Sequence, residues 1–194
     1  MDYYRQSKNS HNMNNIKILC ALPQEVDGLY DTEIFFTGVG KVNAASTTEQ
    51  IIKDYKPKLI INYGTAGTLK KDIIGLVQVT GFVDRDMDAT PQGFKLGQTP
   101  FEKDIMLGTD KIVCGTGDTF ATSKPKIDCD IVDMEAYAIA KICKKHKVNF
   151  LCFKYISDSA DGDAPNEWEQ NVANGCKQFK EQVMDNIKKY EEFF

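Results

Sequence analysis

Short apolar runs, separated by segments with helical spacing, constrain the fold of this chain more than any other feature of its sequence. Residues 16–22 read IKILCAL and residues 150–156 read FLCFKYI, with no regular polar alternation. Such near-continuous runs are typical of strands that are covered on both faces. The predicted strands comprise residues 16–22, 59–62, 76–83, 111–114 and 150–156.

The segments between these strands carry the three-to-four-residue spacing of helices. Helices are predicted over residues 41–55, 135–146 and 166–190. Strands that alternate with helices predict an α/β fold, here a three-layer sandwich whose central twisted sheet, mostly parallel or mixed, is flanked by helices. We expect a single domain over residues 16–194 and a polar tail, disordered or loosely attached, over residues 1–15.

Charge and composition exclude several classes of function. The formal net charge is -4 and the isoelectric point is near 5.3, which disfavours a surface for nucleic acid or anionic membranes. No apolar run approaches the roughly 20 residues of a membrane helix, and the polar first residues do not form a signal peptide. The 6 cysteines show no CxxC spacing, so we expect buried, reduced thiols and a cytoplasmic protein.

Carboxylic acids are left as the groups that can carry chemistry. Neither His11 nor His146 has a neighbour that would complete a metal site or a nucleophile–histidine pair, so we predict no metal and no cofactor. The glycine turns at residues 38–41 and 64–67 lack the spacing of dinucleotide-binding and P-loop motifs. Their backbone amides are still suited to approach an anion or a hydroxyl group.

Polar residues follow several predicted strands where those strands end. Glu25, Thr65, Asp118 and Asp158 should gather at one edge of the sheet, where α/β folds bind ligands. Carboxyl groups there suit cleavage of a glycosidic bond, which needs a general acid for the leaving group and an activated water on the other face. Asp158 follows an apolar strand, where burial would help it keep its proton. The alternatives are that Asp158 caps a turn and that Glu25 is an ordinary helix-start acid.

A series of motifs resembles the 5′-methylthioadenosine/S-adenosylhomocysteine nucleosidases, which are members of the purine nucleoside phosphorylase superfamily. The motifs occur in the family's order and extend over most of the chain from residue 16. The most specific pair is VDMEA at residues 132–136 and ISDSAD at residues 156–161. The others are ALPQEV at 21–26, GVGKV at 38–42, INYGTAG at 61–67 and GDTF at 117–120.

The resemblance implies a nucleoside phosphorylase-like fold, shortened relative to the family, and the hydrolysis of an N-glycosidic bond. The implied substrate is a purine nucleoside, with adenine favoured as the base, such as methylthioadenosine, S-adenosylhomocysteine or 5′-deoxyadenosine, and the implied setting is methionine salvage. By the same resemblance, Glu25 activates the attacking water and Asp158 protonates N7 of the purine.

Other motif positions imply contacts with the substrate. Glu135 would bind the ribose hydroxyls with Met134 beneath the sugar, and Phe120 would stack on the base. Trp168 stands where the family has a phenylalanine that closes the pocket. The remaining implied site residues line the pocket or support its loops, and these are Leu22, Val39, Thr65, Lys154 and Ser157.

The chain departs from the family pattern at some of these positions. Thr65 replaces a serine and keeps the hydroxyl group. Lys154 replaces an arginine near the catalytic water, which keeps the charge but loses the bidentate fork. The stretches 26–38 and 98–111 are shorter than is usual in the family.

The resemblance also implies a partner. Residues 86–94 match the loop that the second subunit of a homodimer contributes to the 5′ pocket. Gln92 stands in that loop where the family often has phenylalanine, which favours a more polar 5′ group. The predicted partners are therefore a small-molecule nucleoside and a second copy of the chain, with no nucleic acid and no membrane.

The sequence leaves two alternatives to a hydrolase. A phosphorylase would use phosphate, but Asn62 stands where phosphorylases carry an arginine, the only arginines are Arg5 and Arg85, and Glu25 would repel the anion. A non-catalytic nucleoside-binding protein would explain the shortened loops. Such a protein would not need both the water-activating and the base-protonating acid.

Overall fold

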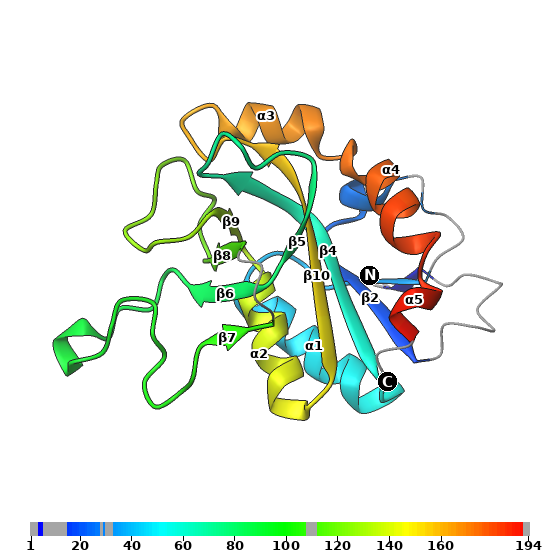
Figure 1. The fold of residues 1–194 in the computed structure, drawn as a ribbon, viewed down its shortest axis with the longest axis horizontal. Helices are drawn as coiled ribbons and strands as arrows, with labels where there is room; N and C mark the ends of the chain where they lie inside the picture. Colours follow the sequence, from blue (N-terminus) through cyan, green and yellow to red (C-terminus); the bar gives the residue numbers. More distant parts are fainter. Residues whose placement is uncertain (1–3, 6–14, 28, 30–32, 108–111, 192–194) are drawn as a thin grey trace.

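Two long strands, β4 (Leu59–Thr68) and β10 (Asn149–Asp158), run side by side in parallel through the middle of the molecule (Figure 1). The computed structural model describes residues 4–5, 15–27, 29, 33–107 and 112–191. The strand order of the sheet is β1-β3-β2-β4-β9-β8-β6-β7. β10 pairs with β4 along one edge and with β5 along its other edge. The other strands are β1 (Tyr4–Arg5), β2 (Ile16–Cys20), β3 (Ile34–Phe36), β5 (Leu76–Val79), β6 (Gly81–Asp84), β7 (Ile105–Met106), β8 (Val113–Thr116) and β9 (Ile131–Asp133).

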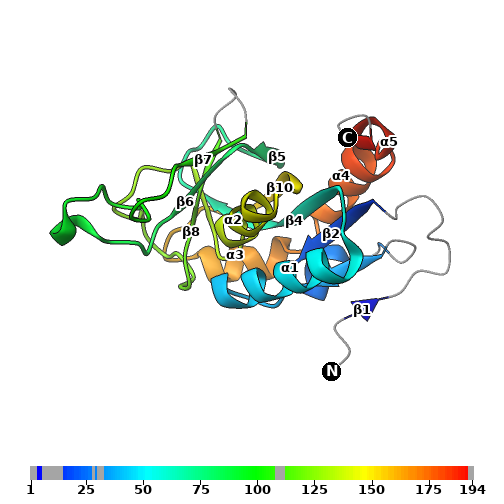
Figure 2. The same ribbon diagram turned by 90° about the horizontal axis from the view of Figure 1, so that it is seen from below.

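Helices cover both faces of this sheet. Successive side chains of a strand point to opposite faces, so Ile60 packs in one apolar cluster with α1 (Lys41–Tyr55) and α2 (Ala136–His146). Ile61 packs in the opposite cluster with α4 (Gly175–Phe179), as Figure 2 lets the reader follow. The predicted three-layer sandwich with a mixed sheet is confirmed. The remaining helical segments are η1 (Pro23–Val26), η2 (Thr90–Gln92), α3 (Ala164–Asn171), the π-helical η3 (Lys180–Met184) and α5 (Lys188–Glu191).

The glycine segment at residues 64–67 is part of a strand, and its prediction as a turn was wrong. Gly64 pairs with Lys154 on β10, and Gly67 pairs with Val132 on β9. Neighbouring strands on both sides therefore hold this segment extended. Glycine serves close approach here, because a Cβ on Gly64 would stand 3.2 Å from both Glu25 Oε1 and Lys154 Nζ.

Two other predicted elements are divided. The strand predicted over 76–83 is β5 followed by β6, because the chain changes partners at Thr80, from β10 to β8. The helix predicted over 166–190 is broken into α3, α4, η3 and α5. At the start of α4, a Cβ on Gly175 would overlap the ring of Tyr155, so the chain passes there at close range over β10. By contrast, α1 has the predicted bounds.

The prediction of buried thiols is confirmed, whereas most of the predicted tail lies outside the described residues. Tyr4–Arg5 pairs antiparallel with β3, while residues 1–3 and 6–14 of the predicted tail lie outside the described residues. Parts of the shortened stretches, namely residues 28, 30–32 and 108–111, lie outside them as well. Each cysteine is buried and free, as predicted. Among the helices that the structure describes, none has the length and apolar character to cross a membrane.

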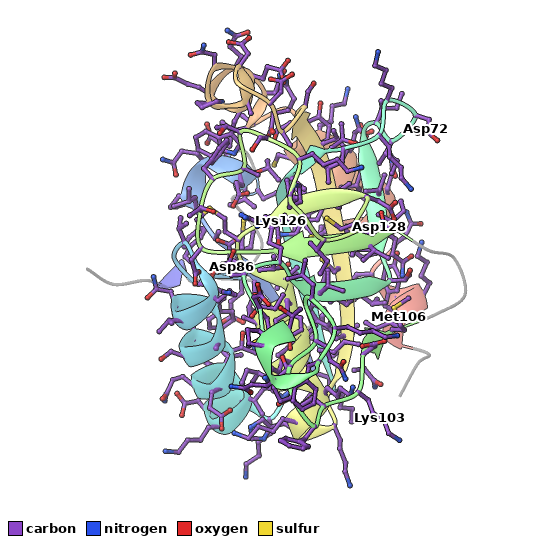
Figure 3. All side chains as sticks on the ribbon, turned by 90° about the vertical axis from the view of Figure 1, so that its left-hand side faces the viewer. Asp72, Asp86, Lys103, Met106, Lys126 and Asp128 are labelled. Atoms are coloured by element: carbon purple, nitrogen blue, oxygen red, sulfur yellow. The ribbon has the colours of Figure 1, made fainter. Side chains whose placement is uncertain are left out.

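The segment between β6 and β7, residues 85–104, forms an arm that extends away from the sheet (Figures 1 and 2). Figure 3 views this end of the molecule, with Asp86 near the start of the arm and Met106 on β7 after it. Phe101 on the arm is 95% exposed and meets the ring of Phe94 edge to face, with the centroids 5.4 Å apart. The arm therefore presents an aromatic side chain to solvent.

Candidate active site

A pocket of about 460 Å³ opens where β2, β4, β9 and β10 end, a volume within the range of small-molecule sites. It contains every predicted site residue except Lys154 and Ser157, which stand behind its wall, and Asp118 is likewise not among the lining residues. The wall is formed by Ala21, Leu22, Glu25, Val39, Thr65, Ala66, Gly67, Arg85, Thr119, Phe120, Ala121, Val132, Asp133, Met134, Glu135, Asp158, Pro165, Trp168 and Glu169.

The carboxylate of Glu25 is held by donors on both oxygens. Its side chain is buried on η1, directly after β2. Oε1 accepts hydrogen bonds from the backbone N–H of Thr65 at 2.7 Å and from its hydroxyl at 2.8 Å. Oε2 accepts from the backbone N–H of Leu22 at 3.0 Å and from the Cys20 thiol at 3.2 Å. This arrangement fixes the carboxylate and suits an acceptor.

An ion pair between Lys154 and Asp133 supports the pocket from behind. The Nζ–Oδ2 distance is 2.8 Å, and the two side chains are only 2% and 1% exposed. Asp133 also accepts from the Thr116 hydroxyl at 2.6 Å and from the backbone N–H of Ala136 at 2.9 Å. Burial opposes ionisation of Asp133, but the Lys154 ammonium and these donors keep its pKa below the usual value. Sequence reasoning missed this role of Asp133, for which its place in the VDMEA motif was the available signal.

Asp158 ends β10 with its carboxyl group buried at the pocket wall. The Ser157 hydroxyl donates to Oδ2 at 2.8 Å, and the backbone N–H of Ala160 donates to Oδ1 at 3.0 Å. Burial raises the pKa of Asp158 above its ordinary value, and the negative charges of Glu167 and Asp161 act in the same direction. The environment therefore favours a carboxyl group that keeps its proton to higher pH than an exposed aspartate.

Glu135 stands at the N-terminus of α2 and reaches the turn before α1. Its Oε1 accepts the backbone N–H of Gly40 at 2.9 Å. Burial raises the pKa of Glu135 to about 8, and the negative charge of Asp133 adds to this effect. Near neutral pH the group can therefore both donate and accept hydrogen bonds, which suits the recognition of hydroxyl groups.

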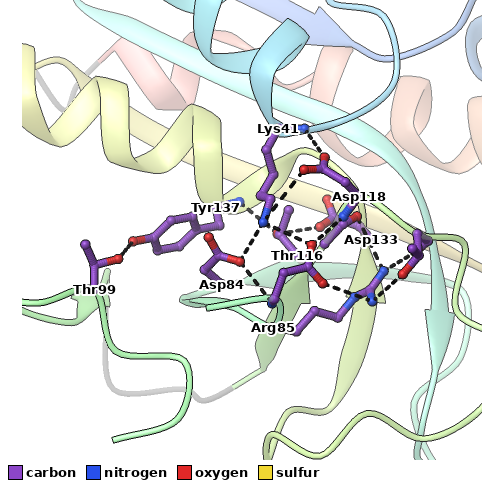
Figure 4. Close-up of polar contacts among 11 residues, drawn as sticks. Lys41, Asp84, Arg85, Thr99, Thr116, Asp118, Asp133 and Tyr137 are labelled. Carbon is purple, nitrogen blue, oxygen red and sulfur yellow. Dashed lines mark hydrogen bonds and ion pairs between the residues drawn. The ribbon is translucent and has the colours of Figure 1, made fainter. Parts of the chain in front are cut away.

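A charged network joins the loops around the pocket (Figure 4). Lys41 Nζ pairs with Asp84 at 2.7 Å and with Asp86 at 3.0 Å, and its backbone N–H donates to Asp118 Oδ1 at 2.7 Å. The start of α1 is thereby tied to the end of β6 and to the loop after β8. Asp118 thus caps a helix N-terminus beside the pocket, where its negative charge is favoured.

Arg85 shapes the loop that carries Phe120. Its guanidinium donates to the Thr119 hydroxyl at 3.2 Å, to the Gly117 carbonyl at 3.4 Å and to the Thr119 carbonyl. Phe120 itself is half-exposed at the pocket wall. Arg85 therefore holds the loop at residues 117 and 119, and the Phe120 ring remains exposed to the pocket.

Comparisons with known proteins identify the family of this chain. A family model described as the phosphorylase superfamily matches residues 28–114 and 105–192. The 5′-methylthioadenosine/S-adenosylhomocysteine nucleosidase of Staphylococcus haemolyticus (strain JCSC1435) is 31% identical, over 78% of this chain and 79% of the relative. The chain belongs to the nucleosidase family of the phosphorylase superfamily. The resemblance found in the sequence motifs is thereby confirmed.

Solved structures of the superfamily share the fold. A putative 5′-methylthioadenosine/S-adenosylhomocysteine nucleosidase from Francisella philomiragia superposes with a TM-score of 0.82 at 21% identity, covering 91% of this chain and 99% of that one. A futalosine hydrolase mutant of Helicobacter pylori superposes with a TM-score of 0.75 at 21% identity, covering 83% and 93%. The same fold therefore occurs in a protein named for methylthioadenosine and S-adenosylhomocysteine and in one named for futalosine.

Proposed function

We propose that this protein is an N-ribosyl hydrolase that releases the base from a purine nucleoside, with Asp158 as the general acid and Glu25 as the general base. One observation carries the proposal. A single pocket presents both a carboxyl group whose pKa burial raises, Asp158, and a carboxylate surrounded by donors, Glu25. Hydrolysis of a glycosidic bond needs both a general acid for the leaving group and a general base for the attacking water. The nucleosidase relatives support the same reaction class.

The general acid acts on the leaving base. A purine leaves poorly as an anion, so a proton must reach N7 as the bond to the sugar stretches. Burial raises the pKa of Asp158, which favours its protonated form, and Ser157 and Ala160 hold the carboxyl group in place. The proton moves from Asp158 to N7, and the electron pair of the broken bond stays with the base.

The general base acts on the opposite side of the sugar. Glu25 accepts a proton from a water molecule as the water oxygen attacks C1′, which yields the free sugar. Glu135 binds the ribose hydroxyls, and Met134 packs beneath the ring. Phe120, whose ring is exposed at the pocket wall, stacks on the base.

Water is favoured over phosphate as the nucleophile. Asn62 is fully buried, and its Nδ2 donates to the backbone carbonyls of Leu19 at 3.1 Å and Tyr63 at 3.3 Å, so it is not free to bind an anion. Arg85 lines the pocket, but its two terminal nitrogens donate to carbonyl groups and a hydroxyl of the 117–119 loop, and only its buried Nε has no partner among the described residues. The Glu25 carboxylate would repel a phosphate dianion.

The arm supports a homodimer with composite pockets. Residues 86–94 would complete the 5′ pocket of the second copy, with Gln92 there favouring a polar 5′ group. The exposed ring of Phe101 on the same arm gives such a contact its apolar part. Sedimentation velocity at working concentration should give a dimer, and a monomer would contradict this arrangement. The buried, free cysteines support a cytoplasmic location.

A panel of nucleosides tests the function. Base release should be measured with methylthioadenosine, S-adenosylhomocysteine, 5′-deoxyadenosine, adenosine and inosine. Release from at least one adenine nucleoside is expected, and the ranking identifies the 5′ group. Nucleoside binding without any release would instead favour a binding protein.

A further inference from the structure

The single tryptophan of the chain makes a polar contact inside the pocket. Trp168, on α3, donates from its indole Nε1 to the hydroxyl oxygen of Thr65 at 2.9 Å. That hydroxyl lies 2.8 Å from Glu25 Oε1. Three elements far apart in the sequence, namely α3, β4 and η1, are thereby joined in one line of hydrogen bonds.

The chemistry of the groups fixes the direction of this line. An indole N–H is a donor only, so the Thr65 oxygen is the acceptor in its bond to Trp168. The one hydroxyl proton of Thr65 is then left for Glu25. Without the indole donor, the hydroxyl could rotate and direct its proton elsewhere, for instance to water. The backbone N–H of Thr65 would still donate to the same oxygen at 2.7 Å, so the carboxylate would be loosened rather than released.

A phenylalanine at position 168 would carry no donor, so it could cover the pocket but could not orient a hydroxyl group. The donor of Trp168 is therefore the property that the variants below remove.

We propose that Trp168 is a positioning residue for the general base: its indole N–H orients the Thr65 hydroxyl toward Glu25. This inference rests on the proposed function of Glu25. Trp168 also lines the pocket. The side chain that covers the substrate therefore also directs the Thr65 hydroxyl to the Glu25 carboxylate. The position of α3 is thereby linked to the geometry of the group that activates water.

Kinetics of three variants separate this role from simple covering of the pocket. Trp168→Phe keeps an aromatic ring and removes the donor, whereas Thr65→Val removes the hydroxyl and keeps the backbone N–H. Each should lower kcat by about tenfold, because each weakens or removes the hydrogen bond from the Thr65 hydroxyl to the Glu25 carboxylate, and KM should change less.

The double variant gives the decisive comparison. Because Trp168 acts through the Thr65 hydroxyl, Trp168→Phe should cause little further loss of kcat in the Thr65→Val background. Losses that multiply to about a hundredfold would show that the two side chains act independently, and would overturn the inference.

A spectroscopic measurement tests the contact without relying on activity. A protein with one tryptophan gives one indole N–H resonance in a ¹⁵N-labelled sample. Thr65→Val should move this resonance and speed its exchange with water. Thr47→Val is the matched control, because the Thr47 hydroxyl, on α1, donates to the Thr37 carbonyl and neither residue lines the pocket. An unmoved resonance in Thr65→Val would overturn the inference, whereas a wild type that releases no base would overturn the proposed function alone.

Discussion

Gly67 on β4 and Asp158 on β10 lie in direct contact, so that a Cβ at position 67 would overlap Oδ1 of the Asp158 carboxyl group. The same Cβ would stand 3.0 Å from the Cβ of Ala160. The proposed acid therefore rests against bare backbone on one side and receives hydrogen bonds from Ser157 and Ala160. Its position depends on the absence of a side chain at residue 67.

Gly67→Ala should displace Asp158 and lower kcat. A displacement of about 1 Å at a reacting group can cost about a hundredfold in rate. Gly162→Ala is the matched control, since a Cβ there meets nothing within 4 Å and the backbone is not left-handed. Steady-state base release should fall only in the first variant, and equal rates in the two variants would contradict the contact.

Asp158→Asn should abolish the acid function while the fold is kept. An amide cannot deliver the proton that N7 needs, so kcat should fall by about 10²–10⁴-fold. Asp72→Asn, at an exposed position that does not line the pocket, should change kcat little. Circular dichroism would verify that both variants fold. Unchanged turnover in Asp158→Asn would refute its assignment.

Glu135 should make the protein less stable as the pH rises. Its pKa is about 8 in the folded state against a usual value of 4.5, so between these pH values the folded state holds a proton that the unfolded state has released. The free energy of unfolding therefore falls with rising pH in this window. Glu135→Gln should remove much of this slope in urea denaturation at pH 5 and pH 8. An unchanged slope would show that Glu135 titrates normally.

Lys154→Met should destabilise the fold, because it leaves the buried Asp133 carboxylate without its cationic partner. Breaking a buried ion pair in this way costs about 3–5 kcal/mol. Lys177→Met is the control, since Lys177 is 81% exposed and an exposed substitution changes stability by about 0.5 kcal/mol or less. Chemical denaturation of the two variants would compare them directly, and a similar small effect in both would contradict the structural role of the pair.

Local sequence patterns predicted much of the fold and of the pocket wall. Helix α1 has the predicted bounds because its glycine turn and Pro57 are local signals at either end. Motif positions such as Glu25, Glu135 and Asp158 meet in one pocket because the strand ends that carry them converge.

What the sequence could not predict depends on contacts between distant elements. Asp133 and Lys154 lie on different strands, each a neighbour of β4, and no local spacing marks them as a pair. The glycines of residues 64–67 look like a turn, because glycine for close approach and glycine for chain reversal are alike in sequence. The contact of Trp168 with Thr65 likewise depends on where α3 packs.

The most direct test of hydrolysis is to identify the sugar product with and without phosphate. The wild-type protein should be incubated with the most reactive nucleoside of the panel, and free sugar and sugar 1-phosphate should be quantified together with the released base. We predict one free sugar for each base, at a rate that phosphate does not change, because Glu25 delivers water to C1′. Formation of sugar 1-phosphate, or base release only when phosphate is present, would contradict the proposed hydrolase.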